Sequence, residues 1–168
     1  MIKRTLPYTA NINYTLYEPR NCTADTPTLV FIPGALQDPT KHEYVSFRLA
    51  CTGVRSLYIP TQLIRTDIQE NFDELVVQSL KFIDYIRENV GRVSCVVGHS
   101  LGGLIALRIA LIDDKSTVAV FSPFLGLDVS PCSIISNYFT PKLVGSTPVS
   151  EGNDIQFVIK NYRFIREA

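Results

Sequence analysis

Short runs of apolar, largely β-branched residues alternate with stretches of helical periodicity, and this alternation constrains the fold more than any other feature of the chain. The first run, Thr28–Ile32 (TLVFI), ends at a Pro-Gly pair and is typical of a strand buried on both faces of a sheet. Three further strands are predicted at Val54–Ile59, Val93–Val97 and Thr117–Phe121, and Asn13–Tyr17 alternates enough to predict one more.

Helical patterns separate these runs. Apolar residues recur at helical spacing from Asn71 to Asn89, where acidic residues lie near the start and Gly91 follows the end. Tyr44–Cys51 and Leu101–Ile112 are predicted to be shorter helices. Strands that alternate with helices form βαβ units. The sequence therefore predicts an α/β fold, a mostly parallel sheet with helices on both faces.

The length of 168 residues favours one compact domain over residues 1–168. Residues 1–123 are predicted to form its core. The segment Phe124–Glu151 is rich in Pro, Ser, Thr and Gly and has no clear period, and Asp154–Arg166 is predicted to form a final helix. We interpret residues 124–168 as the possible start of a cap over the core.

Charge and cysteine content exclude several classes of protein. The 16 basic and 16 acidic side chains balance without a long charged run, which argues against nucleic-acid or polybasic membrane partners. The four cysteines are scattered, and Cys95 is expected to be a buried, inert thiol. No metal or organic cofactor is implied. Without a signal peptide or an apolar run long enough to span a bilayer, a cytoplasmic location is expected.

The motif with the clearest chemistry is Gly98-His99-Ser100-Leu101-Gly102, a G-x-S-x-G pentapeptide between a predicted strand and a predicted helix. A turn this tight requires nearly side-chain-free positions beside the serine, and it lifts the hydroxyl clear of the sheet at a helix N-terminus. The alternative, in which Ser100 is only an N-cap, does not explain the two flanking glycines or Gly103. We attribute Leu101-Gly102-Gly103 to close packing of the helix against the sheet.

With this motif in its context, the sequence resembles the α/β-hydrolase superfamily, particularly its lysophospholipase, monoacylglycerol-lipase and serine-aminopeptidase-like branch. Leu29–Ala35 lies where that branch has a strand followed by His-Gly-x, and Phe121–Leu127 resembles the strand that leads into its cap. The resemblance implies that Ser100 is a nucleophile acting on carboxylic esters or acylglycerols. It also implies that the backbone N–H groups of Ala35 and Leu101 form the oxyanion hole. Pro33 replaces the family's usual histidine, which makes the loop stiffer and removes a donor.

The remaining members of a catalytic triad are harder to assign. The resemblance implies the order Ser, acid, His, but the chain contains only His42 and His99, and both precede or adjoin Ser100. His99 is expected to point away from the nucleophile, and His42 is a candidate base or a solvated residue. Asp128 is a candidate acid or a turn residue. Three other aspartates are given structural roles: Asp113 and Asp114 are predicted to form a solvated corner, and Asp154 is predicted to be an N-cap.

A serine without its base is a weak nucleophile, and loss of a triad member costs on the order of 10⁴ to 10⁶ in turnover. Three interpretations therefore remain open. The chain is a truncated hydrolase that lacks its C-terminal strands, a catalytically inactive relative that serves as a binding or interaction protein, or an enzyme that takes its histidine from His42 or from a partner chain. An open sheet edge at the last strand also favours a homodimer. The expected partner is otherwise a small ester or lipid-like substrate.

Overall fold

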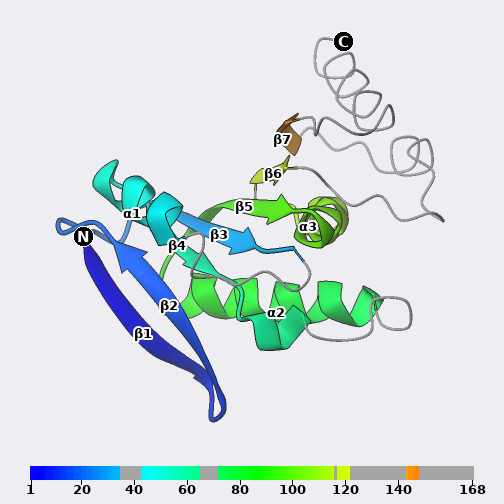
Figure 1. The fold of residues 1–168 in the computed structure, drawn as a ribbon, viewed down its shortest axis with the longest axis horizontal. Coiled ribbons are helices and arrows are strands. Elements are labelled where there is room, and N and C mark those ends of the chain that lie inside the picture. Colours follow the sequence, from blue (N-terminus) through cyan, green and yellow to red (C-terminus); the bar gives the residue numbers. More distant parts are fainter. Residues whose placement is uncertain (35–42, 65–71, 116, 122–142, 148–168) are drawn as a thin grey trace.

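The computed structural model describes residues 1–34, 43–64, 72–115, 117–121 and 143–147 (Figure 1). They form a seven-stranded sheet in the order β1-β2-β4-β3-β5-β6-β7. The strands are β1 (Ile2–Thr9), β2 (Ile12–Glu18), β3 (Thr28–Ile32), β4 (Arg55–Tyr58), β5 (Val93–His99), β6 (Thr117–Phe121) and β7 (Leu143–Thr147). The helices are α1 (Glu43–Cys51), α2 (Phe72–Asn89) and α3 (Leu101–Ile112), with a 3₁₀ turn, η2, at Thr61–Ile64. The predicted α/β fold is confirmed.

The sheet is parallel from β4 to β7 and antiparallel at its N-terminal edge. β3 pairs in parallel with β4 and β5, and β6 pairs in parallel with β5 and β7. β1 and β2 instead form an antiparallel hairpin, and β2 joins the sheet antiparallel to β4. The mostly parallel sheet is therefore as predicted, with a hairpin added along one edge (Figure 1).

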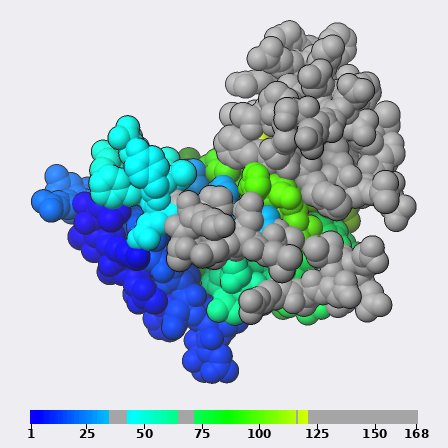
Figure 2. All heavy atoms as spheres, in the orientation of Figure 1, coloured from blue at the N-terminus to red at the C-terminus, as the bar shows by residue number. Residues whose placement is uncertain are grey.

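Helices cover both faces of this sheet. α2 and α3 pack against each other and against β5, whereas α1 contacts β2 and β4. On the face of α1, Ser46 Oγ donates a hydrogen bond of 2.8 Å to the Tyr58 hydroxyl. On the face of α2, Tyr85 donates from its hydroxyl to the Pro7 carbonyl at 3.0 Å. Figure 1 shows α1 and α2 on opposite sides of the sheet, and α1 and the hairpin lie together at one side of the molecule (Figure 2).

The main core lies between the sheet and the α2–α3 layer. Side chains with no exposed surface come from both layers, among them Val30, Ile32, Leu57, Val96, Phe82, Ile83, Ile105 and Ile109. α3 is apolar almost all round because it is enclosed by α2, β3, β5 and β6. In β3, burial is complete at alternate residues only, and Leu29 and Phe31 are half-buried.

Two strands are found where the sequence analysis predicts none. β1 carries mostly exposed side chains, so it lacks the apolar run used to predict the central strands. β7 lies inside the segment described above as having no period, and it pairs with β6, which is therefore not at the edge of the sheet. Pairing of a second chain with a sheet edge stays a prediction. The helix predicted at Asp154–Arg166 and most of the cap region, 124–168, lie outside the described residues.

The solvated corner predicted at Asp113 and Asp114 is wrong for Asp113. Its side chain is 8% exposed, and Oδ2 lies 2.5 Å from Nη2 of Arg87 near the end of α2. Asp114 is exposed. The ion pair links the C-terminal ends of α2 and α3, so Asp113 is part of the helix packing. Sequence periodicity cannot detect this because the partner lies 26 residues away.

Candidate active site

Ser100 lies between the last residue of β5 and the first residue of α3, with φ 54° and ψ −120°. Within the described ranges, it is the only residue other than glycine that has a positive φ. Such a conformation costs roughly 1–3 kcal/mol and persists only where the surrounding structure holds it. The G-x-S-x-G segment thus forms a strained turn from strand to helix.

The two glycines of the motif are needed because backbone passes close to both. A Cβ added to Gly98 would lie 2.1 Å from the carbonyl oxygen of Gly102 and 2.7 Å from Cβ of Ala106. A Cβ added to Gly102 would lie 2.1 Å from the carbonyl oxygen of Ile32 and 2.5 Å from that of Pro33. The first turn of α3 is therefore pressed against both β5 and the end of β3, as predicted for Leu101-Gly102-Gly103.

Ser100 occupies the N-cap position of α3, but its hydroxyl makes no capping hydrogen bond. Its carbonyl oxygen instead accepts from the N–H groups of Gly103, at 2.9 Å, and Leu104, at 3.2 Å. The side chain is half-buried. An N-cap role alone does not account for this serine, because such a role uses the side-chain oxygen.

The N–H of Leu101 is the first of α3, and the first amides of a helix have no acceptor within the helix. The positive end of the helix dipole lies at the same place and favours negative charge beside Ser100. The contact of Gly102 with Ile32 and Pro33 brings the segment after β3 to the same helix end. Two main-chain segments, the start of α3 and the end of β3, therefore approach Ser100 from neighbouring strands.

Three residues proposed from the sequence for this site, Ala35, His42 and Asp128, lie outside the described residues. His99 is described and half-buried, and it pairs with Phe121 in the register of β5 and β6. Cys95, on the same strand, is also half-buried rather than fully buried. Burial raises the pKa of its thiol although a backbone hydrogen bond from Ala119 opposes the shift, so the thiol stays protonated at neutral pH.

Two other kinds of site, a metal centre and a membrane-spanning helix, are absent from the described residues. Across the described ranges, no group of three or more His, Cys, Asp or Glu side chains is placed to hold a metal ion. None of the helices in those ranges is long and apolar enough to cross a membrane. The sequence analysis missed one polar cluster, which joins Arg4, Glu18 and Arg55 across three strands. No local pattern marks it, because its members meet only when the hairpin pairs with β4.

Comparison with known sequences gives one family. Residues 65–168 match the family described as serine aminopeptidase, S33, and the match spans more than half of the chain, including the pentapeptide and α3. Comparison with curated proteins gives no match.

Solved structures with a similar fold include Est1E and two proteins named as esterases. Est1E from Butyrivibrio proteoclasticus has a TM-score of 0.56 and 20% identity, over 85% of this chain and 58% of that chain. The esterase domain of a Rhodothermus marinus protein has a TM-score of 0.57 and 19% identity, over 73% of this chain and 51% of that chain. Esterase 2 of Thermogutta terrifontis, phosphorylated by paraoxon, has a TM-score of 0.56 and 15% identity, over 73% of this chain and 58% of that chain. The chain thus spans between half and three fifths of the length of these structures, and identities this low establish the fold alone.

Proposed function

Because the chain belongs to the serine aminopeptidase S33 family and has the α/β-hydrolase fold, we propose that it is a serine hydrolase whose nucleophile is Ser100. The observation that carries the proposal is the backbone of Ser100, held at φ 54° between two glycines that leave no room for a Cβ. A strained turn at a strand–helix junction presents a hydroxyl to substrate above the edge of the sheet. The Ser100 hydroxyl makes no capping hydrogen bond with α3, which supports the same role.

The substrates we propose are small carboxylic esters or acylglycerols. Two of the structures with a similar fold are named as esterases, and this likeness supports ester substrates in the proposal. In the proposed step, Ser100 Oγ attacks the ester carbonyl carbon while its proton passes to a base. The carbonyl oxygen becomes an oxyanion, which the N–H groups of Leu101 and Ala35 stabilise. Collapse of this intermediate expels the alcohol, and water then releases the acid from the serine.

The candidates for the base and the acid come from the sequence, because both lie outside the described residues. His42 is the candidate base, unless a partner chain supplies a histidine, and Asp128 is the candidate acid. The alternative function is binding without catalysis on the same fold, and the reactivity of Ser100 decides between the two, because a serine without a base is a weak nucleophile. Without a base, the oxyanion donors and binding alone retain only a small part of the rate.

Reaction with a fluorophosphonate probe separates the two functions, because an activated serine is phosphonylated whereas an ordinary hydroxyl is not. We expect the wild-type protein to be labelled and Ser100→Ala to be unlabelled. Ser94→Ala is the matched control, because Ser94 lies on β5, the strand that leads to Ser100, with an ordinary backbone conformation, and its loss should not affect labelling. Paraoxon is a suitable second reagent, since it phosphorylates the esterase from Thermogutta terrifontis.

Hydrolysis of 4-nitrophenyl butyrate by the same variants then tests turnover, and His42→Ala tests the base. Labelling that persists in Ser100→Ala would refute the assignment of the nucleophile. A folded wild-type protein that neither reacts with the probe nor hydrolyses the ester would refute the proposed enzymatic function. Binding without catalysis would then be the function. Loss of turnover in His42→Ala, with folding preserved, would support His42 as the base.

A further inference from the structure

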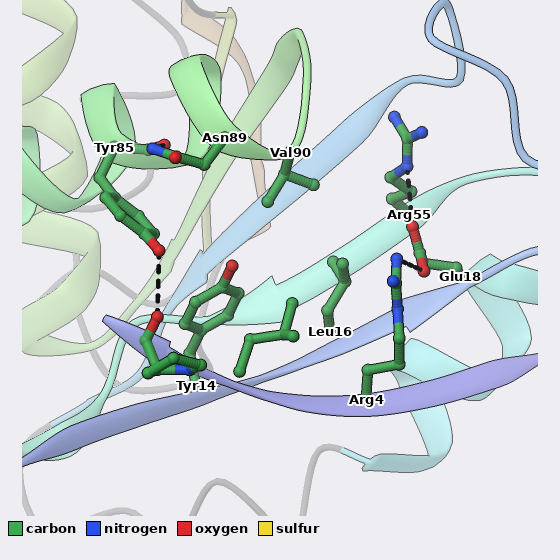
Figure 3. Close-up of a pocket in the computed structure, with 10 residues that line it drawn as sticks. Arg4, Tyr14, Leu16, Glu18, Arg55, Tyr85, Asn89 and Val90 are labelled. Atoms are coloured by element: carbon green, nitrogen blue, oxygen red, sulfur yellow. Dashed lines mark hydrogen bonds and ion pairs between the residues drawn. The ribbon is translucent and has the colours of Figure 1, made fainter. Parts of the chain in front are cut away.

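A cleft of about 380 Å³ lies between the β1–β2 hairpin and the C-terminal end of α2 (Figure 3). It is lined by side chains from both strands of the hairpin, by Arg55 of β4 and by residues at the end of α2. All of these residues are within the described ranges. The volume is in the range of pockets that hold small molecules.

One end of the cleft carries a surplus of positive charge. Glu18 is buried, and its carboxylate forms ion pairs with both Arg4 and Arg55. Each nitrogen of the Arg55 guanidinium has a partner: Nε donates to Glu18 at 3.3 Å, Nη1 to the Thr26 carbonyl at 3.0 Å, and Nη2 to the Thr23 carbonyl at 2.7 Å. Arg55 alone therefore balances the charge of Glu18, and the cluster of two cations and one anion has a net charge of +1.

Arg4 is the member of the cluster that can accept a further partner. Its side chain is 52% exposed, and Nη2 is the atom that pairs with Glu18. A guanidinium has five N–H donors in a planar fork that matches a carboxylate. Arg4 lines the cleft, and its charge lowers the pKa of the Tyr14 hydroxyl against the larger opposing effects of burial and of Tyr85.

Apolar side chains separate this charged end from a second polar end. Leu16 and Val90 lie between the arginines and the pair of tyrosines (Figure 3), and Leu6 also lines the cleft. At the second end the Tyr85 hydroxyl is held by the Pro7 carbonyl, and the Asn89 amide donates to the carbonyl of Tyr85 at 2.8 Å. Both groups are thus held by the protein, and Leu16 and Val90 supply apolar contact between the two ends.

We propose that this cleft binds a small amphipathic organic anion, in which one carboxylate is attached to a short alkyl chain or a single aromatic ring. The carboxylate would pair with the remaining donors of Arg4, and the apolar body would lie over Leu6, Leu16 and Val90. The added negative charge would neutralise the cluster, and burial of the alkyl or aromatic group would add affinity at roughly 25 cal/mol per Å².

This site is separate from Ser100. Arg55 begins β4, and the end of α2 leads into the start of β5, whereas Ser100 follows the end of β5. The seven residues of β5 therefore lie between them, which is roughly 20 Å of extended chain at about 3.3 Å per residue. Binding in the cleft does not require hydrolysis at Ser100, so the inference stands apart from the proposed function.

Octanoate is the probe, followed by ¹H–¹⁵N correlation spectra and by calorimetry. We expect saturable binding that shifts the amides of residues 4–6, 14–18 and 85–90. Arg4→Gln should weaken binding at least tenfold, whereas Arg48→Gln, which removes an exposed arginine on the opposite face, should leave it unchanged. Octanol and acetate, each lacking one half of the ligand, should bind at least tenfold more weakly than octanoate.

Val90→Phe is a second variant, because its larger ring would fill the apolar part of the cleft and leave the charges intact. It should also weaken binding of octanoate, and it tests the site even if Arg4→Gln does not fold. The proposal is overturned if octanoate binds equally to Val90→Phe or to folded Arg4→Gln. It is also overturned if acetate or octanol binds as tightly as octanoate, or if the shifted amides lie elsewhere.

Discussion

Replacing Gly102 with alanine tests how closely α3 packs against β3. In an isolated helix this change would be stabilising by about 1 kcal/mol, because alanine has the higher helix propensity. Here the new Cβ would lie 2.1 Å from the carbonyl oxygen of Ile32 and 2.5 Å from that of Pro33. Both obstacles are backbone atoms, so no rotation of a side chain can remove the clash.

The magnitude follows from how little this part of the structure can move. The atoms must separate by about 0.9 Å to reach the 3.0 Å limit of real Cβ contacts. Ile32 is fully buried, and its strand is fixed by register on both sides, to β4 and to Gly98 of β5. Overpacking of this kind costs about 1–3 kcal/mol or more, which exceeds the gain in helix propensity. We expect a net loss of about 2 kcal/mol in the free energy of unfolding.

Urea denaturation measures this loss, and thermal unfolding should show a Tm lower by about 4–8 °C at this chain length. Ile112→Ala is the control, because Ile112 is 64% exposed at the end of the same helix and its change should stay near 0.5 kcal/mol. The rate of labelling at Ser100 should fall as the turn is displaced. A Gly102→Ala variant as stable as the wild type, or more so, would show that α3 and β3 are not packed as described.

Three further predictions concern other parts of the molecule. Arg87→Met removes the ion pair from the buried carboxylate of Asp113 and should cost about 3 kcal/mol in a urea titration, whereas loss of a surface ion pair would cost less than about 1 kcal/mol. Burial, with a smaller effect of Tyr85, raises the pKa of Tyr14 to about 12, so the folded state holds this proton more tightly than the unfolded state, where the pKa is near 10. This contribution to the free energy of unfolding is complete below pH 10 and is lost between pH 10 and 12. In Tyr14→Phe the free energy of unfolding should therefore fall less steeply between pH 10 and 12. An unchanged slope would exclude Tyr14 as its source. Ser100→Gly should raise the stability by about 1 kcal/mol, because it relieves the strain at φ 54°, while it abolishes labelling; a destabilised variant would contradict the strain.

Elements in the centre of the sheet follow from the sequence with good accuracy. Thr28–Ile32, Leu101–Ile112 and Thr117–Phe121 have the bounds predicted for them, because a buried element must be apolar along its length and turn residues end it. The G-x-S-x-G turn is predictable for a related reason. Its glycines are required by close contacts with backbone atoms a few residues away in sequence or on the adjacent strand. The spacing of the glycines in the sequence therefore indicates the turn.

The edges of the sheet do not follow from the sequence. β1 exposes most of its side chains, so its sequence is free of the apolar pattern that marks a central strand. β7 lies in a segment with turn-like composition, and its partner β6 is more than 20 residues away. Pairing between backbones stabilises both strands, and backbone pairing leaves little trace in residue type.

For this protein, the sequence by itself determined the α/β class, the central strands and the strained turn at Ser100. It did so because each depends on short-range periodicity or on glycine at a fixed spacing. Only the tertiary structure decided the order of the strands, the burial of Asp113 against Arg87, and the cleft where Arg4 and Arg55 share Glu18. Those features depend on charges and backbone groups from distant parts of the chain, whose meeting no local pattern encodes.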